Sequence, residues 1–404
     1  MNHLPWICCQ IGAREHYAIP RALARQKLLL GLITDVWVQA KLPFRLFPPS
    51  YLASWRSRFH PELAEQRVHY FNYSLYQFEL SQKIARSSVW QTTIARNQWF
   101  QAQALKVLQS YPKGDRFTLF TYSYAALELF KYAKSRGWQT VLGQIDAGIV
   151  HQQILDREAS KHPELQTPVA PVPELYWANW LAECQLADRI IVNSDWSKQA
   201  LEQQQISSSK IEIIPLAYQS QTAKQFTRIY PPKFTSDRPL KILYLGRVTL
   251  GKGIASLFAA MAVLPEQAIE LTIVGSVQIE LPPQVRADRR INFVGSVPRN
   301  LTPHYYQQAD VFIFPTLSDG FGITQLEAQA WQLPIIASRH CGAVVKDRVN
   351  GLILPNVTES EIAKSITFCL NNPQKISIFS DNSCQTIFNF SLSKITQKLI
   401  KNRC

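Results

Sequence analysis

The sequence predicts an α/β protein with two domains and a cleft between them. With 404 residues the chain is too long for one hydrophobic core, so two domains are expected. Short apolar runs alternate with longer helical stretches, which indicates parallel sheets wrapped by helices. A polar stretch containing Pro231, Pro232 and Pro239 separates two such series and predicts a linker. The expected parts are a first domain over 1–218, a linker over 219–239, a second domain over 240–385 and a C-terminal helix within 386–404.

The first series opens with a short apolar strand that runs into Ile11-Gly12. Helical spacing of apolar residues then gives way to β-branched residues, and this alternation continues along the domain. The expected elements, in order, are strand 6–10, helix 19–30, strand 32–38, strand 117–122, helix 125–135, strand 139–145 and strand 190–193.

The second series begins directly after the linker. Its expected strands are 240–245, 271–274, 291–294, 311–315 and 334–337. The segment 391–403 has Leu392, Ile395 and Leu399 at helical spacing, with lysines on the opposite face. Since the carboxyl ends of parallel strands share one edge, the cleft between two such sheets is the expected place for a small ligand.

Composition narrows the class of protein. The chain is 46% hydrophobic and 18% charged, which excludes global disorder. No uncharged apolar run reaches the roughly 18 residues that a bilayer span needs, and the first residues lack the pattern of a secretory signal. Seven cysteines without metal-binding spacing are expected to be free thiols in a reducing cytoplasm.

The charge balance predicts anionic partners. The chain has 43 Lys and Arg against 29 Asp and Glu, a formal net charge of +14. Such an excess favours nucleotide phosphates, nucleic acid or an acidic membrane surface. Before His60, eight basic residues stand against Glu15 and Asp35, interleaved with Trp37, Phe44 and other large apolar residues. One interpretation of this stretch is a peripheral contact with anionic lipid or with an acidic acceptor. The other is a solvated basic face above a buried helix, and we favour this second interpretation slightly.

Two glycine-rich turns in the second half carry the chemistry. The strand that ends at Leu245 is followed by Gly246-Arg247 and then by Lys252 between two glycines. Glycine lets a backbone approach an anion closely, and Arg247 with Lys252 can neutralise a diphosphate. Taken alone, this turn is better explained as an ordinary strand-to-helix turn with two exposed cations.

The second turn, 319–327, connects a strand to a helix. The helix N-terminus near 322–324 suits a phosphate, and Asp319 and Glu327 flank it. Carboxylates beside an anion site are explained if they accept hydrogen bonds from sugar hydroxyls. Gly275 and Gly295 follow two further strands and are expected along the same sheet edge.

The order of these blocks resembles the family 4 glycosyltransferases. The matching blocks are 245–253, 274–275, 294–295, 309–315, 319–328, 334–338 and 350–352, with weaker likeness at 187–194 and 210–215. Enzymes of this family are retaining and metal-independent, and have the GT-B fold of two Rossmann-like, doubly wound domains facing across a cleft. The resemblance also implies that the C-terminal helix crosses back to the first domain.

The resemblance assigns roles to individual residues. Arg247 and Lys252 would bind the donor diphosphate and stabilise the leaving nucleotide, Glu327 would bind the ribose, and Asp319 would contact the transferred sugar. The donor-binding set it implies is Gly246, Gly275, Gly320, Phe321, Gly322, Ile323 and Glu327. On the acceptor side, Gly12 resembles the family's glycine loop, and His16 lies just beyond it.

Four features depart from the family pattern, and two of them fall on site residues. Of the other two, Leu333 stands where a helix-ending Gly is common, and Cys341-Gly342-Ala343 replaces what is often a two-glycine stretch followed by Glu. Asp319 replaces the usual Glu, so the carboxylate is drawn back by one carbon. Asp146 occupies a place where many members carry a His that touches the sugar, and His151 follows five residues later. We expect Asp146 to line the cleft and to belong, with Arg247, Lys252 and Asp319, to the catalytic set.

The resemblance implies a hexosyltransferase that moves a sugar from a nucleotide-diphosphate donor to a carbohydrate or lipid-linked acceptor. Such an enzyme needs no cofactor and no metal, and would serve polysaccharide or glycolipid synthesis in the cytoplasm or on the inner face of a membrane. One alternative is a catalytically silent GT-B subunit that binds a nucleotide sugar or supports a partner enzyme. A nucleic-acid-binding protein is disfavoured, because the chain has no recognisable binding motif.

Overall fold

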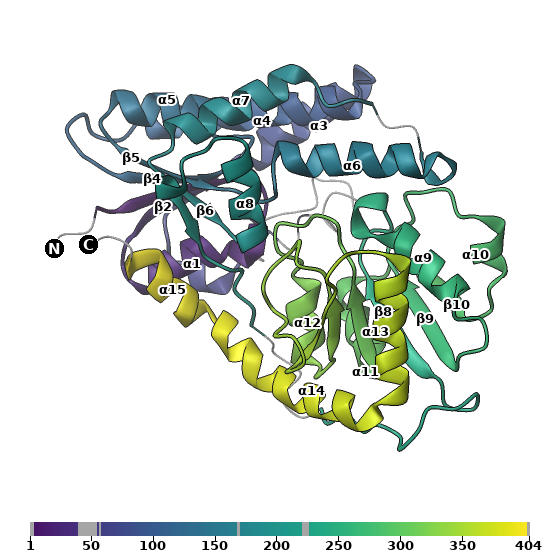
Figure 1. Ribbon diagram of the computed structural model, residues 1–404. Helices are drawn as coiled ribbons and strands as arrows, with labels where there is room; N and C mark the ends of the chain where they lie inside the picture. Colours follow the sequence, from purple (N-terminus) through teal and green to yellow (C-terminus); the bar gives the residue numbers. More distant parts are fainter. Residues whose placement is uncertain (1–3, 39–54, 56–57, 168–169, 220–225, 402–404) are drawn as a thin grey trace.

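The computed structural model describes residues 4–38, 55, 58–167, 170–219 and 226–401. Two parallel β-sheets, each wrapped by helices, lie side by side (Figure 1). Part of the basic N-terminal stretch, 39–54 and 56–57, lies outside the described residues, as does 220–225 of the expected linker.

The first sheet has seven strands in the order β3-β2-β1-β4-β5-β6-β7, and neighbouring strands are parallel. Its strands are β1 (Trp6–Gln10), β2 (Leu29–Thr34), β3 (Val68–Tyr70), β4 (Thr118–Tyr122), β5 (Gln139–Gly143), β6 (Arg189–Val192) and β7 (Ile211–Ile213). The chain order reverses between β1 and β4, which opens a crevice at the carboxyl ends of these strands.

The helices of this half include α1 (Ala18–Arg25), α3 (Asn72–Ile84), α4 (Val89–Leu108), α5 (Leu127–Ser135), α6 (Ile149–Lys161), α7 (Glu174–Leu186) and α8 (Asp195–Gln203). Helix α4 begins at a capping box, in which Ser88 accepts from the Gln91 N–H and Gln91 accepts from the Ser88 N–H. Side chains alternate along β1: Ile7 and Cys9 pack under α4, α5 and α7, whereas Trp6 and Cys8 face α1.

The second sheet has six parallel strands in the order β10-β9-β8-β11-β12-β13. They are β8 (Leu240–Leu245), β9 (Ile269–Val274), β10 (Ile291–Gly295), β11 (Val311–Phe314), β12 (Ile335–Ala337) and β13 (Gly351–Ile353). The helices around them include α9 (Ile254–Ala262), α10 (Pro283–Ala287), α11 (Thr302–Gln308), α12 (Thr324–Ala330) and α13 (Glu359–Asn371). The switch point lies between β8 and β11, so this sheet also has a crevice at its carboxyl edge.

Helix α6 belongs to the first half of the sequence but lies over the second sheet unit (Figure 1). Leu165, just beyond α6, packs into the core of the second unit, and its carbonyl accepts from the Glu280 N–H at 3.1 Å. Leu155 of α6 lies against Gly251, beside Lys252. The N-terminal turn of α6 is thereby fixed above the turn that carries Arg247 and Lys252.

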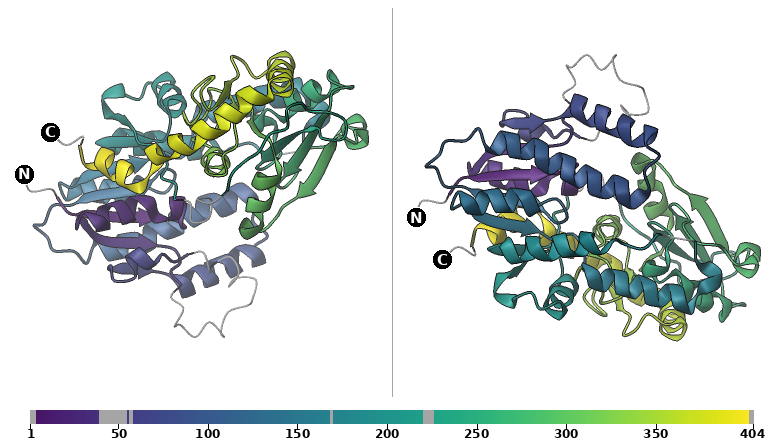
Figure 2. Two further views of the ribbon diagram at one scale, coloured as in Figure 1. Left: turned by 90° about the horizontal axis from the view of Figure 1, so that it is seen from below. Right: turned by 90° about the horizontal axis from the view of Figure 1, so that it is seen from above.

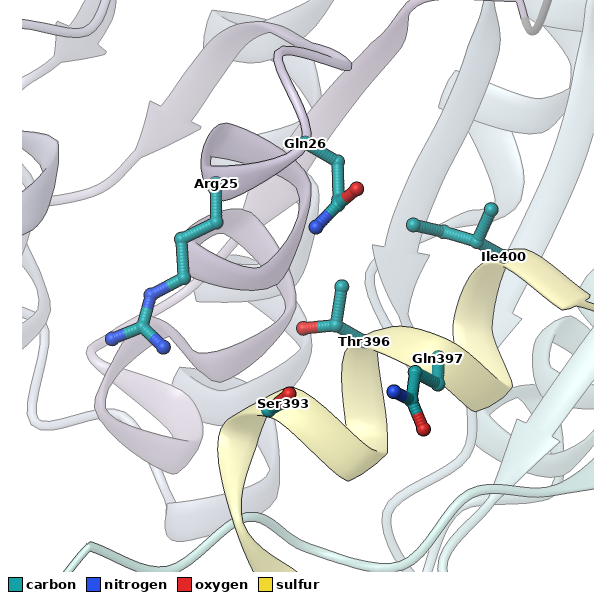
Figure 3. A pocket seen from close by; sticks show the side chains of 6 residues that line it. All are labelled: Arg25, Gln26, Ser393, Thr396, Gln397 and Ile400. Carbon is teal, nitrogen blue, oxygen red and sulfur yellow. The ribbon is translucent and has the colours of Figure 1, made fainter.

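The chain returns to the first unit at its C-terminal end (Figure 2). Helix α14 (Pro373–Thr386) contacts α12 and leads to α15 (Leu392–Lys401), which packs against α1. Leu392, Ile395 and Leu399 are buried in the core that includes Trp6 and Leu23. A cavity of about 340 Å³ remains between α1 and α15 (Figure 3). Its walls are Arg25 and Gln26 on the α1 side and Ser393, Thr396, Gln397 and Ile400 on α15.

Two of the expected boundaries are wrong. The helix expected over 19–30 ends at Arg25, because Lys27 takes a left-handed conformation with φ of 56°. The strand expected over 32–38 therefore begins earlier, at Leu29, and ends at Thr34. Strands β3, β7 and β13 were absent from the elements that periodicity predicts. No described helix is long and apolar enough to span a bilayer.

Candidate functional site

The two cations of the first glycine turn have different surroundings. Arg247 follows β8 and is exposed, and it forms no ion pair with any residue that the structure describes. Lys252 lies one short turn later, where its ammonium pairs with Asp319 and lies 5.6 Å from the centre of the Phe314 ring. The edge of the second sheet therefore presents one free and one paired positive charge toward the cleft.

The second glycine turn touches the first unit. Asp319 accepts a hydrogen bond from the Phe321 N–H at 3.0 Å, which fixes its carboxylate beside Lys252. A Cβ on Gly320 would lie 2.1 Å from the Ile145 carbonyl oxygen, so only glycine permits this approach. The turn and the end of β5 are in direct backbone contact across the cleft.

Asp146 is held rigidly at that contact. Its Oδ1 accepts from the Tyr124 hydroxyl at 2.7 Å and from the Gln144 amide and the Gly148 N–H, both at 2.9 Å. Tyr124 is itself in the left-handed region, with φ of 74°, which a tyrosine adopts only where its surroundings hold it. Three donors on one oxygen fix the direction in which the carboxylate faces the cleft.

His151 lies between the two units, in the first turn of α6. Burial lowers the pKa of His151, the nearby Lys252 and Arg247 lower it further, and Asp146 and Asp319 raise it. Its Nδ1 is buried and has no hydrogen-bond partner in the described part of the chain. A neutral imidazole therefore stands among the four residues expected to be catalytic: Arg247, Lys252, Asp319 and Asp146.

Glu327 lies in α12 and is partly buried. The Tyr306 hydroxyl donates to it at 2.9 Å and the Arg299 guanidinium at 3.2 Å. Burial and the Glu327 charge raise the pKa of Tyr306 well above its ordinary value. Arg299 also contacts the Nε2 of His16 in the first unit, so it links a residue expected on the acceptor side to Glu327, the residue expected at the donor ribose.

The glycine loop after β1 is fixed by a buried carboxylate. Gly12 has φ of 79°, and its N–H donates to Asp35 Oδ1 at 2.8 Å. Asp35 also pairs with Arg58 and Arg96, at 3.2 and 3.0 Å. The loop is thus a rigid wall of the cleft, and the next residues, including His16, take left-handed conformations.

The remaining donor-side residues form the edge of the second sheet. A Cβ on Gly275 would lie 1.9 Å from the Gly246 carbonyl, so the two turns are in contact. Gly322 has φ of 78° and precedes α12, while Ile323 is half-buried. The Phe321 ring packs in the core, where its centre lies 5.9 Å from the centre of the Phe390 ring. Only the backbone of Phe321 therefore faces the turn.

The structure adds Tyr124, Tyr306 and Arg299 to the residues expected from the sequence. None of these three lies in a recognisable motif. The sequence does point to His151, because it follows Asp146 by five residues. Within the described ranges, no group of three His, Cys, Asp or Glu side chains is placed to hold a metal ion.

Comparison with solved structures defines the fold class. Sucrose-phosphate synthase from Thermosynechococcus elongatus superposes with a TM-score of 0.63 at 20% identity, covering 98% of each chain. The Anabaena protein HepE, solved with UDP and glucose, superposes with a TM-score of 0.60 at 15% identity, covering 99% of each chain. The chain therefore has the GT-B fold of two facing Rossmann-like units.

Sequence comparison finds similarity over the second unit. Residues 239–372 match the family described as glycosyl transferases group 1. An uncharacterized glycosyltransferase of Methanocaldococcus jannaschii is 34% identical over 124 residues, 29% of this chain and 32% of the relative. The amylovoran biosynthesis glycosyltransferase AmsK of Erwinia amylovora is 28% identical over 133 residues, 29% of this chain and 33% of the relative. The chain thus spans about a third of the length of these curated relatives.

Proposed function

We propose that the protein is a glycosyltransferase that moves a hexosyl group from a nucleoside-diphosphate donor to a carbohydrate or lipid-linked hydroxyl, with retention of configuration. The observation that carries this proposal is the grouping of Arg247, Lys252, Asp319 and Asp146 around His151 at the facing edges of two Rossmann-like sheets. The match of 239–372 to a glycosyltransferase family supports it, as do structural neighbours solved with UDP or UDP-glucose.

In this proposal the donor diphosphate lies against Arg247 and Lys252, and the nucleoside extends toward Glu327. Negative charge grows on the diphosphate as its bond to the anomeric carbon breaks, and the two fixed cations stabilise that charge. The acceptor oxygen bonds to the anomeric carbon from the face that the diphosphate leaves, and its proton passes to the departing phosphate oxygen.

The first unit supplies positioning. Asp146, with one oxygen occupied by three donors, offers its other oxygen to a sugar or acceptor hydroxyl. Asp319 binds Lys252 before the donor arrives and can exchange that contact for sugar hydroxyls. We propose that no metal takes part, because Arg247 and Lys252 supply the positive charge that the diphosphate requires.

The direct test is incubation with UDP-, GDP- and ADP-sugars, with and without EDTA, while nucleotide release is measured. We expect release with at least one donor, unaffected by EDTA, and an α-linked product from an α-linked donor by NMR. Arg247→Ala and Lys252→Ala should each lower turnover by about 10²–10³-fold. Lys233→Ala removes an exposed cation remote from these turns and serves as the control. Unchanged nucleotide affinity and turnover in both site variants would remove the basis of the proposal.

A further inference from the structure

A second cavity, of about 170 Å³, opens at the carboxyl edge of the first sheet. We name it the β1–β4 pocket. Its polar walls are Gln10, Arg14, Thr93, Asn97, Thr121, Ser123 and Asp146, and its apolar walls include Tyr122, Tyr124 and Tyr176. Because the backbone of Asp146 also lies against Gly320, next to Asp319, the pocket adjoins the proposed site of transfer.

Three polar groups of this pocket are buried without a partner. Gln10, Thr121 and Ser123 are 1%, 1% and 4% exposed. Gln10 Oε1, Thr121 Oγ1 and Ser123 Oγ have no hydrogen-bond partner among the described residues. The other end of the Gln10 amide donates to the Gly12 carbonyl at 2.7 Å, which directs its oxygen away from the loop. Leaving such groups unpaired costs stability, so their convergence on one cavity indicates a ligand that pairs with them.

The pairing groups define the chemistry of that ligand. An amide oxygen only accepts hydrogen bonds, so its partner must donate, which hydroxyls do and phosphate or carboxylate oxygens do not. The charged side chains on the wall are Arg14 and Asp146, whose opposite charges leave the wall without a net charge that would select an ion, and the Arg14 guanidinium carbon lies 5.5 Å from the centre of the Tyr122 ring. The volume is below the roughly 300–1,000 Å³ typical of drug-sized sites, which suits a single ring.

We propose that the β1–β4 pocket binds one uncharged sugar ring of the acceptor, held by Gln10, Thr121 and Ser123. The inference rests on the proposed function for its direction, since a hydroxyl of that ring would face Asp146 and the donor. A free sugar, the end of a glycan and a glycolipid head group share this chemistry.

The test measures binding directly, by saturation-transfer NMR, with methyl glycosides of glucose, galactose and mannose as neutral probes. Glucose 6-phosphate and glucuronic acid are the charged probes. We expect at least one neutral probe to bind, and the charged probes to bind at least tenfold more weakly. Octyl glucoside and maltose are then compared with the methyl glycoside. Tighter binding of octyl glucoside indicates a lipid-linked acceptor, and tighter binding of maltose indicates the end of a glycan.

Two matched threonine variants separate binding from structure. Thr121→Val removes a buried hydroxyl that has no partner, so the melting temperature should stay or rise while affinity for the neutral probe falls about five- to tenfold. Thr140→Val removes a buried hydroxyl that donates to the Leu186 carbonyl at 2.8 Å, so it should lower the melting temperature and leave sugar affinity unchanged.

The proposal is overturned if no neutral probe binds, if a charged probe binds more tightly, or if Thr121→Val leaves sugar affinity unchanged. These outcomes are separable from failure of the proposed function. If sugar binding depends on Thr121 but no nucleotide sugar is turned over, the proposed function is contradicted and the proposed sugar-binding pocket is supported. If turnover occurs and Thr121→Val leaves the KM for the acceptor unchanged, the proposed function is supported and the proposed pocket is contradicted.

Discussion

The contact between His16 and Arg299 joins the two units through two side chains. Burial lowers the pKa of His16, and Arg299 and then Arg21 lower it further. The neutral imidazole accepts from the guanidinium, whereas a protonated ring cannot accept and would repel it. A histidine whose pKa is lower in the folded protein contributes stability above its ordinary pKa of about 6.5, and this stability is lost as the pH falls below that value.

We therefore expect acid to weaken this contact. Between pH 7.5 and 5.5 the melting temperature of the native protein should fall by about 1–2 °C more than that of His16→Gln, whose amide accepts without titrating. The effect is small because the pair is exposed to solvent. Calorimetry over this pH range measures it, and parallel pH profiles for the two proteins would contradict it. His304→Gln, in which a histidine without this contact is replaced, is the control.

At the scale of residues, the sequence allows a prediction where the chemistry sits in a local motif. Lys252 and Asp319 each follow a strand beside glycines, so their meeting at one sheet edge could be expected from topology. Tyr124 and Arg299 could not be found this way, because their roles arise from contacts between segments that are distant in the sequence: Tyr124 reaches Asp146, and Arg299 reaches His16 and Glu327.

At the scale of elements, strands were easiest to predict where they are buried on both faces. β1 and β4 are buried along their whole length, as the centre of a parallel sheet requires. β3 is short, only partly buried and at the sheet edge, so its pattern carries no such signal. The end of α1 was missed because the residue that leaves the helix is Lys27, where glycine or asparagine is usual.

Two elements meet where the turn before α12 touches the end of β5. Gly320→Ala would place a methyl group 2.1 Å from the Ile145 carbonyl, so the turn and the strand end must separate. We expect nucleoside-diphosphate affinity to fall less than the rate of transfer, because Arg247 and Lys252, which supply the positive charge, lie in other turns. Transfer should fall by about 10²-fold, the cost of misplacing reacting groups by about 1 Å.

Titration calorimetry with UDP, GDP and ADP and a steady-state rate measurement check the two halves of this prediction. Gly114→Ala is the control, since a Cβ there meets nothing within 4 Å. A Gly320→Ala protein that transfers sugar at the native rate would show that this contact is not needed for transfer.

For the whole molecule, the structure accounts for part of the positive charge. Arg21 and Arg25 pair with Glu62, and Arg58 pairs with Asp35, so three cations of the basic N-terminal stretch are held in internal ion pairs. These arginines hold segments of the first unit together. Contact with an anionic membrane stays a prediction, and the residues 39–54 on which it also depends lie outside the described ranges.

The return of α15 to the first unit makes that unit depend on both ends of the chain. Leu399 is fully buried against the core below α1, so Leu399→Ala should cost about 2–5 kcal/mol and lower the melting of this unit by about 5–15 °C. Hydrogen exchange should quicken in α1 and β2 and stay unchanged in β8 and β9. Lys398→Ala, one residue earlier on the exposed face, should alter neither. Equal loss of protection in both units would show instead that α15 stabilises the molecule as one cooperative body, with the two sheets unfolding together.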